Sequence, residues 1–125
     1  MAGNTSIVTL TPAPTLDRTY FVNNLEAGGV NRATRVGEEL VGKGINVSRA
    51  LMLANIEAPG IVPIGDADTG VLERTGSEFL TPLWVEGTLR VSTTIVEENG
   101  PTTKINENPR PLKQADWDHV LRLTE

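Results

Sequence analysis

The fold and the site of this chain are decided by the stretch Val41-Gly42-Lys43-Gly44-Ile45-Asn46-Val47-Ser48-Arg49-Ala50, in which two glycines flank a lysine. Glycine lets the backbone come close to a ligand because it has no Cβ. A helical pattern begins directly afterwards, and a helix that starts there points free N–H groups and the positive end of its dipole at whatever lies in front. Together with the charge of Lys43, the stretch predicts a pocket for an anionic or hydroxyl-rich small molecule.

Residues 37–44 also come close to the nucleotide-binding P-loop pattern G-x-x-x-x-G-K-[ST]. The match fails because Gly44 stands where the pattern has the Ser or Thr that holds magnesium. Glu38 and Glu39 would also place two negative charges inside a loop that has to wrap phosphates, and no convincing core strand leads into Gly37. The sequence therefore argues against a nucleotide P-loop. If no ligand binds at residues 42–44, the alternative interpretation is that they form a flexible loop with a surface lysine.

The residues after Gly44 follow a helical period for about three turns. Their apolar positions form one stripe that we expect to face the core: Val47, Ala50, Leu51 and Ala54. Ser48 and Arg49 lie off this stripe, and Asn55 is the predicted C-terminal stop.

Apolar and β-branched runs predict strands over 6–10, 30–36, 60–65, 83–85, 88–97 and 102–107. Helical patterns predict two further helices, over 71–80 and 112–123. Pro63 would suit an edge or the end of its strand, because proline has no N–H to donate. The alternation of strand and helix indicates an α/β sheet with helices packed on it. The polar hairpins fit that sheet poorly, so we expect a separate lid with strands approximately within residues 17–40 and 88–107.

Asp17 is predicted to lie just past the end of the first strand, after the turn at residues 11–14. In open α/β sheets ligands collect at that edge. The alternative is an aspartate that caps the turn by local hydrogen bonds.

The composition limits the classes of function. With 125 residues the chain suits one modest domain, and its net charge of −5 provides no basic stripe for a nucleic acid. The lack of cysteine excludes a disulfide scaffold, thiolate zinc sites and a cysteine nucleophile. The acidic turn at 66–70 does not match a calcium loop, so no metal site is predicted. No signal peptide or apolar run of membrane-spanning length is found, so we expect a cytoplasmic protein without a membrane partner.

Four segments resemble the PfkB/ribokinase family of sugar kinases, and within it most closely the bacterial 1-phosphofructokinase branch. Residues 42–51 (GKGINVSRAL) are similar to the family signature G-K-G-x-N-V-A/S-R-A-L. Residues 9–20 resemble its opening strand and N-P-A-x-D turn, residues 90–92 its R-x-N strand, and residues 103–107 its T-K-I-N-E segment. These segments occur in the family's order across essentially the whole chain.

The resemblance implies a ribokinase-like (Rossmann-like) three-layer α/β sandwich with a β-rich lid, of which residues 1–125 are the N-terminal portion. It implies ATP-dependent phosphorylation of fructose 1-phosphate to fructose 1,6-bisphosphate, with ATP and Mg²⁺ as cofactors of the full-length enzyme. The alternatives are tagatose-6-phosphate kinase or another sugar kinase of this family, and a non-catalytic sugar-binding or dimerisation module.

The resemblance also implies the substrate-binding residues Asp17, Gly42, Lys43, Gly44, Asn46 and Arg90. In the family, residues at the positions of Asp17 and Asn46 bind sugar hydroxyls, the two glycines lie against the sugar, and the two cations hold the substrate phosphate. The lid residues implied are Lys104, Asn106 and Glu107. The lid closes on the sugar phosphate and can form the contact of a homodimer.

The family's G-A-G-D segment, which carries the catalytic base and the anion hole, is not found in this sequence, nor is its nucleotide pocket. Ser92 replaces an asparagine, and Asn108-Pro109 and Gly65-Asp66 replace a proline-glycine pair and a double glycine. We therefore assign no catalytic residue, and we expect a fragment that is inactive by itself, because phosphoryl transfer depends on those parts.

Overall fold

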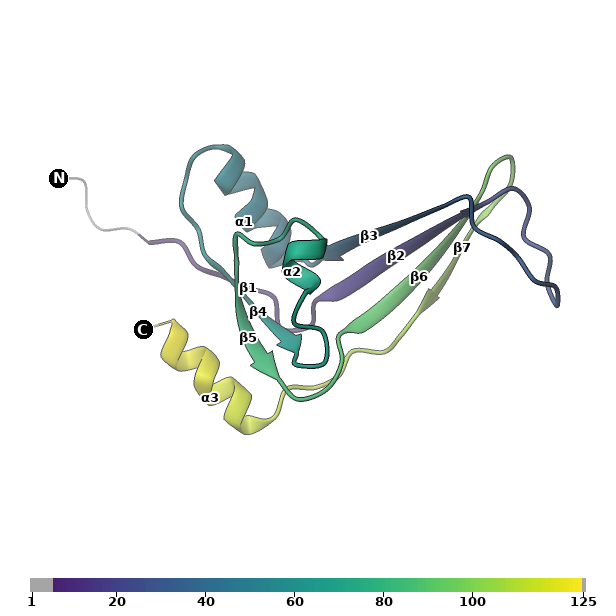
Figure 1. Ribbon diagram of the computed structural model, residues 1–125. Helices are drawn as coiled ribbons and strands as arrows, with labels where there is room; N and C mark the ends of the chain where they lie inside the picture. The colour runs from purple at the N-terminus through teal and green to yellow at the C-terminus, as the bar shows by residue number, and fades with distance from the viewer. Residues whose placement is uncertain (1–5, 125) are drawn as a thin grey trace.

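The computed structural model describes residues 6–124, which form two sheets and three helices (Figure 1). A parallel three-stranded sheet has the order β1-β4-β5, with β1 (Thr9–Leu10), β4 (Gly60–Gly65) and β5 (Leu80–Val85). A mixed four-stranded sheet has the order β3-β2-β6-β7, with β3 (Arg35–Val41), β2 (Thr15–Val22), β6 (Arg90–Glu97) and β7 (Thr102–Asn106). The helices are α1 (Lys43–Leu53), α2 (Val71–Arg74) and α3 (Gln114–Leu123).

Helices cover both faces of the three-stranded sheet. Successive residues of a strand point to opposite faces, and the core divides in the same way. Val62 and Ile64 of β4 pack in one cluster with side chains of α1 and α2, whereas Ile61 and Leu83 pack against Val120 of α3. The layered α/β fold predicted from the sequence is therefore confirmed.

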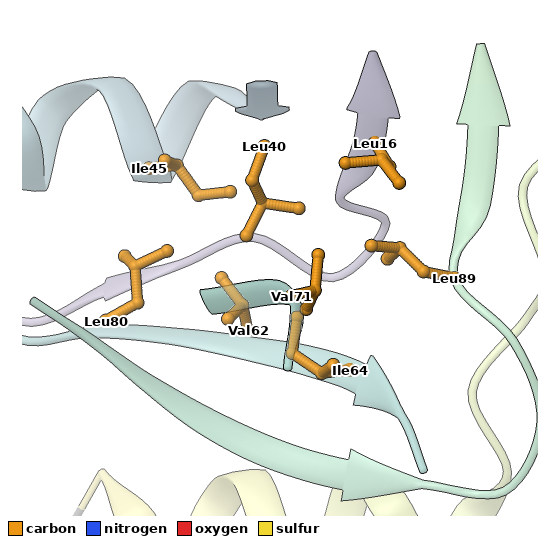
Figure 2. Close-up of a cluster of buried hydrophobic side chains, with 8 residues drawn as sticks. All are labelled: Leu16, Leu40, Ile45, Val62, Ile64, Val71, Leu80 and Leu89. Carbon is orange, nitrogen blue, oxygen red and sulfur yellow. The ribbon is translucent and has the colours of Figure 1, made fainter. Parts of the chain in front are cut away.

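The larger apolar cluster lies where the two sheets meet, as Figure 2 shows. Leu16 of β2 and Leu40 of β3 reach into it from the four-stranded sheet and are 2% and 0% exposed. The other members come from the helices, the parallel sheet and the segment before β6: Ile45, Val62, Ile64, Val71, Leu80 and Leu89. From this anchored end the four-stranded sheet extends away from the helices as an arm (Figure 1).

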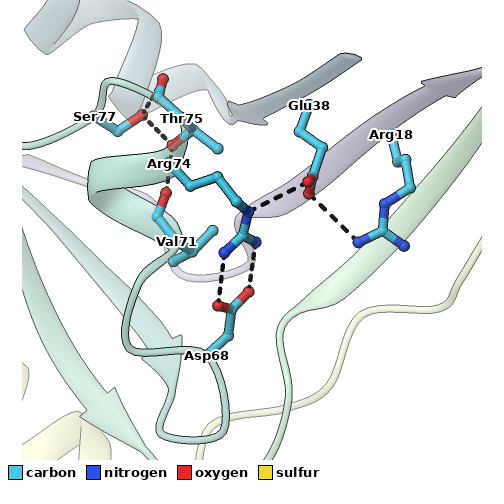
Figure 3. Close-up of polar contacts among 7 residues, drawn as sticks. All are labelled: Arg18, Glu38, Asp68, Val71, Arg74, Thr75 and Ser77. Atoms are coloured by element: carbon cyan, nitrogen blue, oxygen red, sulfur yellow. Dashed lines mark hydrogen bonds and ion pairs between the residues drawn. The ribbon is translucent and has the colours of Figure 1, made fainter. Parts of the chain in front are cut away.

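A chain of ion pairs makes a second connection between the sheets (Figure 3). Arg74 of α2 donates to both carboxylate oxygens of Asp68, at 3.1 and 2.9 Å. Its Nε also donates to Glu38 of β3 at 3.3 Å, and Glu38 accepts from Arg18 of β2 at 3.4 Å. The four side chains thus link the arm to the turn after β4.

Pro63 lies in the middle strand of the parallel sheet, where the sequence favoured an edge or a strand end. Thr9 and Thr11 donate their backbone N–H groups to the carbonyl oxygens of Pro59 and Ile61, at 2.9 and 3.0 Å, so alternate residues of β4 face β1. The next residue on that side is Pro63, and β1 has already ended at Leu10. Proline is tolerated because no ladder bond is required of it there.

The predicted strand over 30–36 is wrong for most of its length, because β3 runs from Arg35 to Val41. The register against β2 places Leu40 opposite Leu16, so both leucines enter the core. Residues 30–34 form a loop instead, in which the Asn31 side chain exchanges hydrogen bonds of 2.8 and 2.9 Å with the backbone of Glu26. Because residues 37–41 are extended strand, the geometry also excludes a phosphate-wrapping loop there.

Two other predicted boundaries are wrong. The helix expected over 71–80 is a single turn that ends at Arg74, because Gly76 adopts a left-handed conformation (φ 66°) and Leu80 already belongs to β5. The strand expected over 6–10 is confined to Thr9–Leu10. By contrast, α3 lies within the expected range 112–123, and Asn55 (φ 61°) follows the end of α1 as predicted.

The predicted core-facing stripe of α1 is also wrong. The buried residues of this helix are Ile45 and Ser48, whereas Val47 is 49% exposed. Ser48 can face the sheet because its hydroxyl forms a hydrogen bond of 2.6 Å with the hydroxyl of Thr9. A polar residue therefore occupies the contact with β1, and the more apolar side of the helix is left partly exposed. No helix in residues 6–124 is long and apolar enough to cross a lipid bilayer.

The ion-pair chain gives a pH-dependent prediction. The hydrogen bonds from Arg74 lower the pKa of Asp68 below its ordinary value of 3.8. A carboxyl with a lowered folded pKa contributes stability above its unfolded pKa and loses that contribution as the pH falls through the folded value. Both side chains are partly exposed, so we expect Asp68→Asn to lower the free energy of unfolding by at most about 1 kcal/mol at pH 7.

Urea denaturation from pH 7 down to about pH 2 tests this prediction. The difference between Asp68→Asn and the wild type should shrink below about pH 4. Glu78→Gln, which changes an exposed carboxylate of the same region, serves as the control. A difference that stays constant over this range would contradict the assigned role of Asp68.

Candidate functional site

The start of α1 is packed closely against Thr11. A Cβ at Gly42 would lie 2.3 Å from Cγ2 of Thr11, and a Cβ at Gly44 would lie 2.6 Å from its Oγ1 and 2.8 Å from the carbonyl oxygen of Leu10. The Thr11 hydroxyl accepts a hydrogen bond of 3.0 Å from the backbone N–H of Ile45. It thereby caps one of the free N–H groups in the first turn of the helix.

This packing changes the interpretation of the two glycines. Gly42 is extended (φ 167°), a conformation open to any residue, so its backbone angles do not require glycine. Space for Thr11 is a sufficient reason for both glycines, whether or not a ligand approaches them. Sequence reasoning missed Thr11, because its partner lies 34 positions further along the chain. Local patterns contain no signal for such a distant cap.

The register of the four-stranded sheet gathers several candidate residues on one face. Thr15 lies between Val41 of β3 and Arg90 of β6, and Asp17 lies between Glu39 and Ser92. Directly opposite residues point to the same face of a sheet. We call this side the polar face and define it by Thr15, Asp17, Thr19, Glu39, Arg90, Ser92, Thr94, Thr102, Lys104 and Asn106. Adjacent strands are about 5 Å apart, so Arg90 and the strand that leads into Gly42 are about 10 Å apart.

Asp17 is the third residue of β2, so the predicted position just past a strand is wrong, and it does not cap a turn. Its carboxylate accepts a hydrogen bond of 3.2 Å from the hydroxyl of Thr94. Next to it lies a hollow of about 340 Å³ lined by Asp17, Thr19, Phe21, Arg35, Gly37, Glu38 and Glu39. A cavity of this size suits a small molecule. Its carboxylates suit hydroxyl groups better than anions.

Arg90 begins β6 at the anchored end of the polar face. Its Nη2 donates to the carbonyl oxygen of Ala13 at 2.9 Å, so its guanidinium lies against the turn between β1 and β2. Its Nε is buried and has no hydrogen-bond partner among the described residues. The side chain therefore brings a positive charge to the same end of the arm at which α1 begins.

The remaining candidates are less closely associated. Lys43 and Asn46 lie in the first turn of α1 and are exposed, and the Asn46 side chain accepts from Arg49 at 3.5 Å. Lys43 and Arg90 share no hydrogen-bond acceptor among residues 6–124. Glu107 follows β7, and its carboxylate accepts from the backbone N–H of Val91 at 3.1 Å. Within the same residues, no cluster of three or more His, Asp or Glu side chains could hold a metal ion.

Comparison with known proteins shows which sequences this chain resembles. No protein-family model matches the chain. The chain is 27% identical over 126 residues to 1-phosphofructokinase from Escherichia coli K12, and 37% identical over 126 residues to 1-phosphofructokinase from Xanthomonas campestris. The alignments cover 92% and 93% of this chain. The chain is therefore similar to 1-phosphofructokinases over nearly its whole length.

A similar fold is found in a solved structure. The structure of phosphofructokinase-2 from Escherichia coli in complex with fructose-6-phosphate matches 94% of this chain with a TM-score of 0.78 and 24% identity. Such a low identity shows a common fold alone. The chain spans 38% and 39% of the length of the two sequence relatives and 40% of the solved structure.

The glycines of the kinase signature can be tested as packing residues. We expect Gly42→Ala to lower the free energy of unfolding by about 1–3 kcal/mol, because the new methyl group would overlap Cγ2 of Thr11. Adding Thr11→Ser should restore most of this loss, because serine lacks Cγ2 but keeps the capping hydroxyl. Gly37→Ala is the matched control, since a Cβ there has no atom within 4 Å.

Chemical denaturation of the three variants and the wild type measures these differences. A Gly42→Ala protein as stable as the wild type would show that the contact with Thr11 does not constrain this position. A double variant that is no more stable than Gly42→Ala would lead to the same conclusion.

Proposed function

We propose that this chain provides the sugar-phosphate-binding and lid portion of an ATP-dependent kinase that converts fructose 1-phosphate to fructose 1,6-bisphosphate. The relatives named 1-phosphofructokinase support this assignment. The structural observation that carries it is the register of β2, in which Thr15 lies between Arg90 and the strand that leads into Gly42. This register brings the signature of α1 and a cation to one end of a polar, partly hollowed face. We place the reaction in the cytoplasm.

Each candidate residue has a role that fits its chemistry. Asp17 accepts hydrogen bonds from sugar hydroxyls in the hollow beside it. Lys43 and Arg90 hold the substrate phosphate by charge-assisted hydrogen bonds. Asn46 can donate to and accept from a hydroxyl, and the backbone at Gly42 and Gly44 faces the sugar.

The arm is the proposed lid. Lys104, Asn106 and Glu107 lie on or directly after β7, at the edge of the arm. Closure of the arm over the sugar phosphate would exclude water, which otherwise competes for the transferred phosphoryl group. ATP supplies that group, and Mg²⁺ neutralises its developing charge. We assign no residue of this chain to ATP or Mg²⁺.

Titration calorimetry of the 125-residue chain with fructose 1-phosphate tests the proposal. We expect Asp17→Ala and Lys43→Ala to weaken binding by about 10-fold each, because each removes a group that makes charge-assisted hydrogen bonds. Arg122→Gln, at the exposed end of α3, should bind like the wild type.

The same titration with fructose, fructose 6-phosphate and tagatose 6-phosphate identifies the preferred sugar. Stronger binding of tagatose 6-phosphate than of fructose 1-phosphate would replace the proposed substrate. Unchanged affinity of both Asp17→Ala and Lys43→Ala for fructose 1-phosphate would refute the site assignment.

We further propose a homodimer through the lid. The face of the arm opposite to the polar face carries Tyr20, Val22, Val36, Ile95 and Ile105. Val36 and Ile105 are 52% and 60% exposed. A groove of about 350 Å³ lies between Tyr20, Ile95 and the loop that holds Leu25. Exposed apolar surface of this kind is typical of interfaces between proteins, and a second copy of the arm matches its character.

Sedimentation velocity over a range of concentrations tests the dimer. We expect the wild type to dimerise and Ile105→Lys to remain monomeric at concentrations where the wild type is dimeric, because a charge would be buried in the contact. Thr102→Lys changes β7 on the polar face and is the matched control. A monomeric wild type, or a dimeric Ile105→Lys variant, would contradict this proposal.

A further inference from the structure

Two adjacent glutamates of β3, Glu38 and Glu39, have no role in the proposed function. Successive residues of a strand point to opposite faces. Glu39 belongs to the polar face, whereas Glu38 lies on the face that also carries Leu40. Each carboxylate meets an arginine of a different helix: Arg74 of α2 for Glu38, and Arg49 of α1 for Glu39. The arm is therefore held between two ion pairs on opposite sides of one strand.

The ion pair on the side of α2 is fully formed (Figure 3). Nε of Arg74 donates to Glu38 at 3.3 Å, and the same guanidinium is fixed by two hydrogen bonds to Asp68. Glu38 also accepts from Arg18 at 3.4 Å, and its side chain is only 22% exposed. These contacts hold the arm against α2.

The ion pair on the side of α1 is loose. Nη1 of Arg49 lies 3.9 Å from the carboxylate of Glu39, which is beyond hydrogen-bond distance, and the Glu39 side chain is 64% exposed. The other contacts of this guanidinium are also long, at 3.5 Å to Oδ1 of Asn46 and 5.5 Å to the centre of the Phe79 ring. Both charged groups are therefore able to form a closer pair.

The position of the two glutamates allows a small rotation of the arm to exchange one pair for the other. Leu40 is buried in the core and marks the anchored end of β3. Arg35, at the other end of this strand, lies about 17 Å away at about 3.3 Å per residue. A rotation about the anchored end that shifts β3 away from α2 lengthens the contact of Glu38 and moves Glu39 toward its own arginine. The same rotation displaces the far end of the arm by a larger distance.

We propose that the arm rotates between two positions, each held by one of these ion pairs. The structure shows the first position, with Glu38 bound to Arg74. In the second position Glu39 is bound to Arg49. Exposed ion pairs contribute little free energy, so one can replace the other at small cost. The two arginines are then positioning residues that set the angle of the arm. That the second position closes over the sugar phosphate rests on the proposed function, but the exchange of the pairs does not.

Distance measurements between two spin labels test the rotation without a ligand. The chain contains no cysteine, so Ala27→Cys and His119→Cys place one label each at chosen positions. Residue 27 lies in the loop at the far end of the arm, and residue 119 lies on α3 (Figure 1). Each position should give its own distance, and the ratio of the two populations measures the equilibrium.

The two glutamates should act in opposite directions. We expect Glu38→Gln to shift the ratio about 2- to 5-fold toward the second position, and Glu39→Gln to shift it by a similar factor toward the first. The double variant should return to the ratio of the wild type, which a general loosening of the arm would not produce. Glu73→Gln removes an exposed carboxylate beside Arg74 and is the matched control. Thermal melts confirm that each variant folds.

The outcomes separate this inference from the proposed function. One distance that neither Glu38→Gln nor Glu39→Gln changes, or a shift in the same direction by both, would refute the exchange of ion pairs and leave the proposed function standing. Saturating fructose 1-phosphate should move the labelled wild type toward the second position. If the variants shift as expected but fructose 1-phosphate moves nothing, the exchange stands and the proposed closure of the lid fails.

Discussion

The contact between Thr11 and the two glycines at the start of α1 determines how the parts of this chain meet. The methyl group of Thr11 allows no Cβ at Gly42, and its hydroxyl caps the N–H of Ile45. A short turn then leads from Thr11 to Thr15, which pairs with Val41 directly before the helix. One residue thus fixes the end of β1, the start of α1 and the anchored end of the arm. The leucines of β2 and β3 complete the connection through the shared core.

Local sequence patterns correctly predicted the elements whose buried side chains follow the hydrophobic periodicity of their own residues. The strand at β4, the long strand β6 and the helix α3 follow from patterns within their own residues. The stripe of α1 failed because the contact with β1 uses Ser48, whose hydroxyl is satisfied only by Thr9, 39 positions away. The strand β3 was misplaced because its position is set by the burial of Leu40 against Leu16 and not by alternation along its own sequence.

The same distinction holds for the site. The signature around Gly42 was found from the sequence, and the register of the arm accounts for the placement of Asp17 and Arg90 on one face. The roles assigned to these residues stay predictions. The importance of Thr11 could not be predicted, because it depends on a partner distant in sequence, Ile45, which lies 34 positions away.

The parallel pairing of β2 with β6 also has a consequence for the order of folding. Asp17 and Thr94 are hydrogen-bonded neighbours although they lie 77 positions apart. Closing so long a loop costs chain entropy before any contact compensates for it, and such pairings form slowly. The hairpin of β2 and β3 is more local and can form first. During synthesis its β2 edge would then remain unpaired until β6 has left the ribosome, and an unpaired strand edge is a site at which chains aggregate.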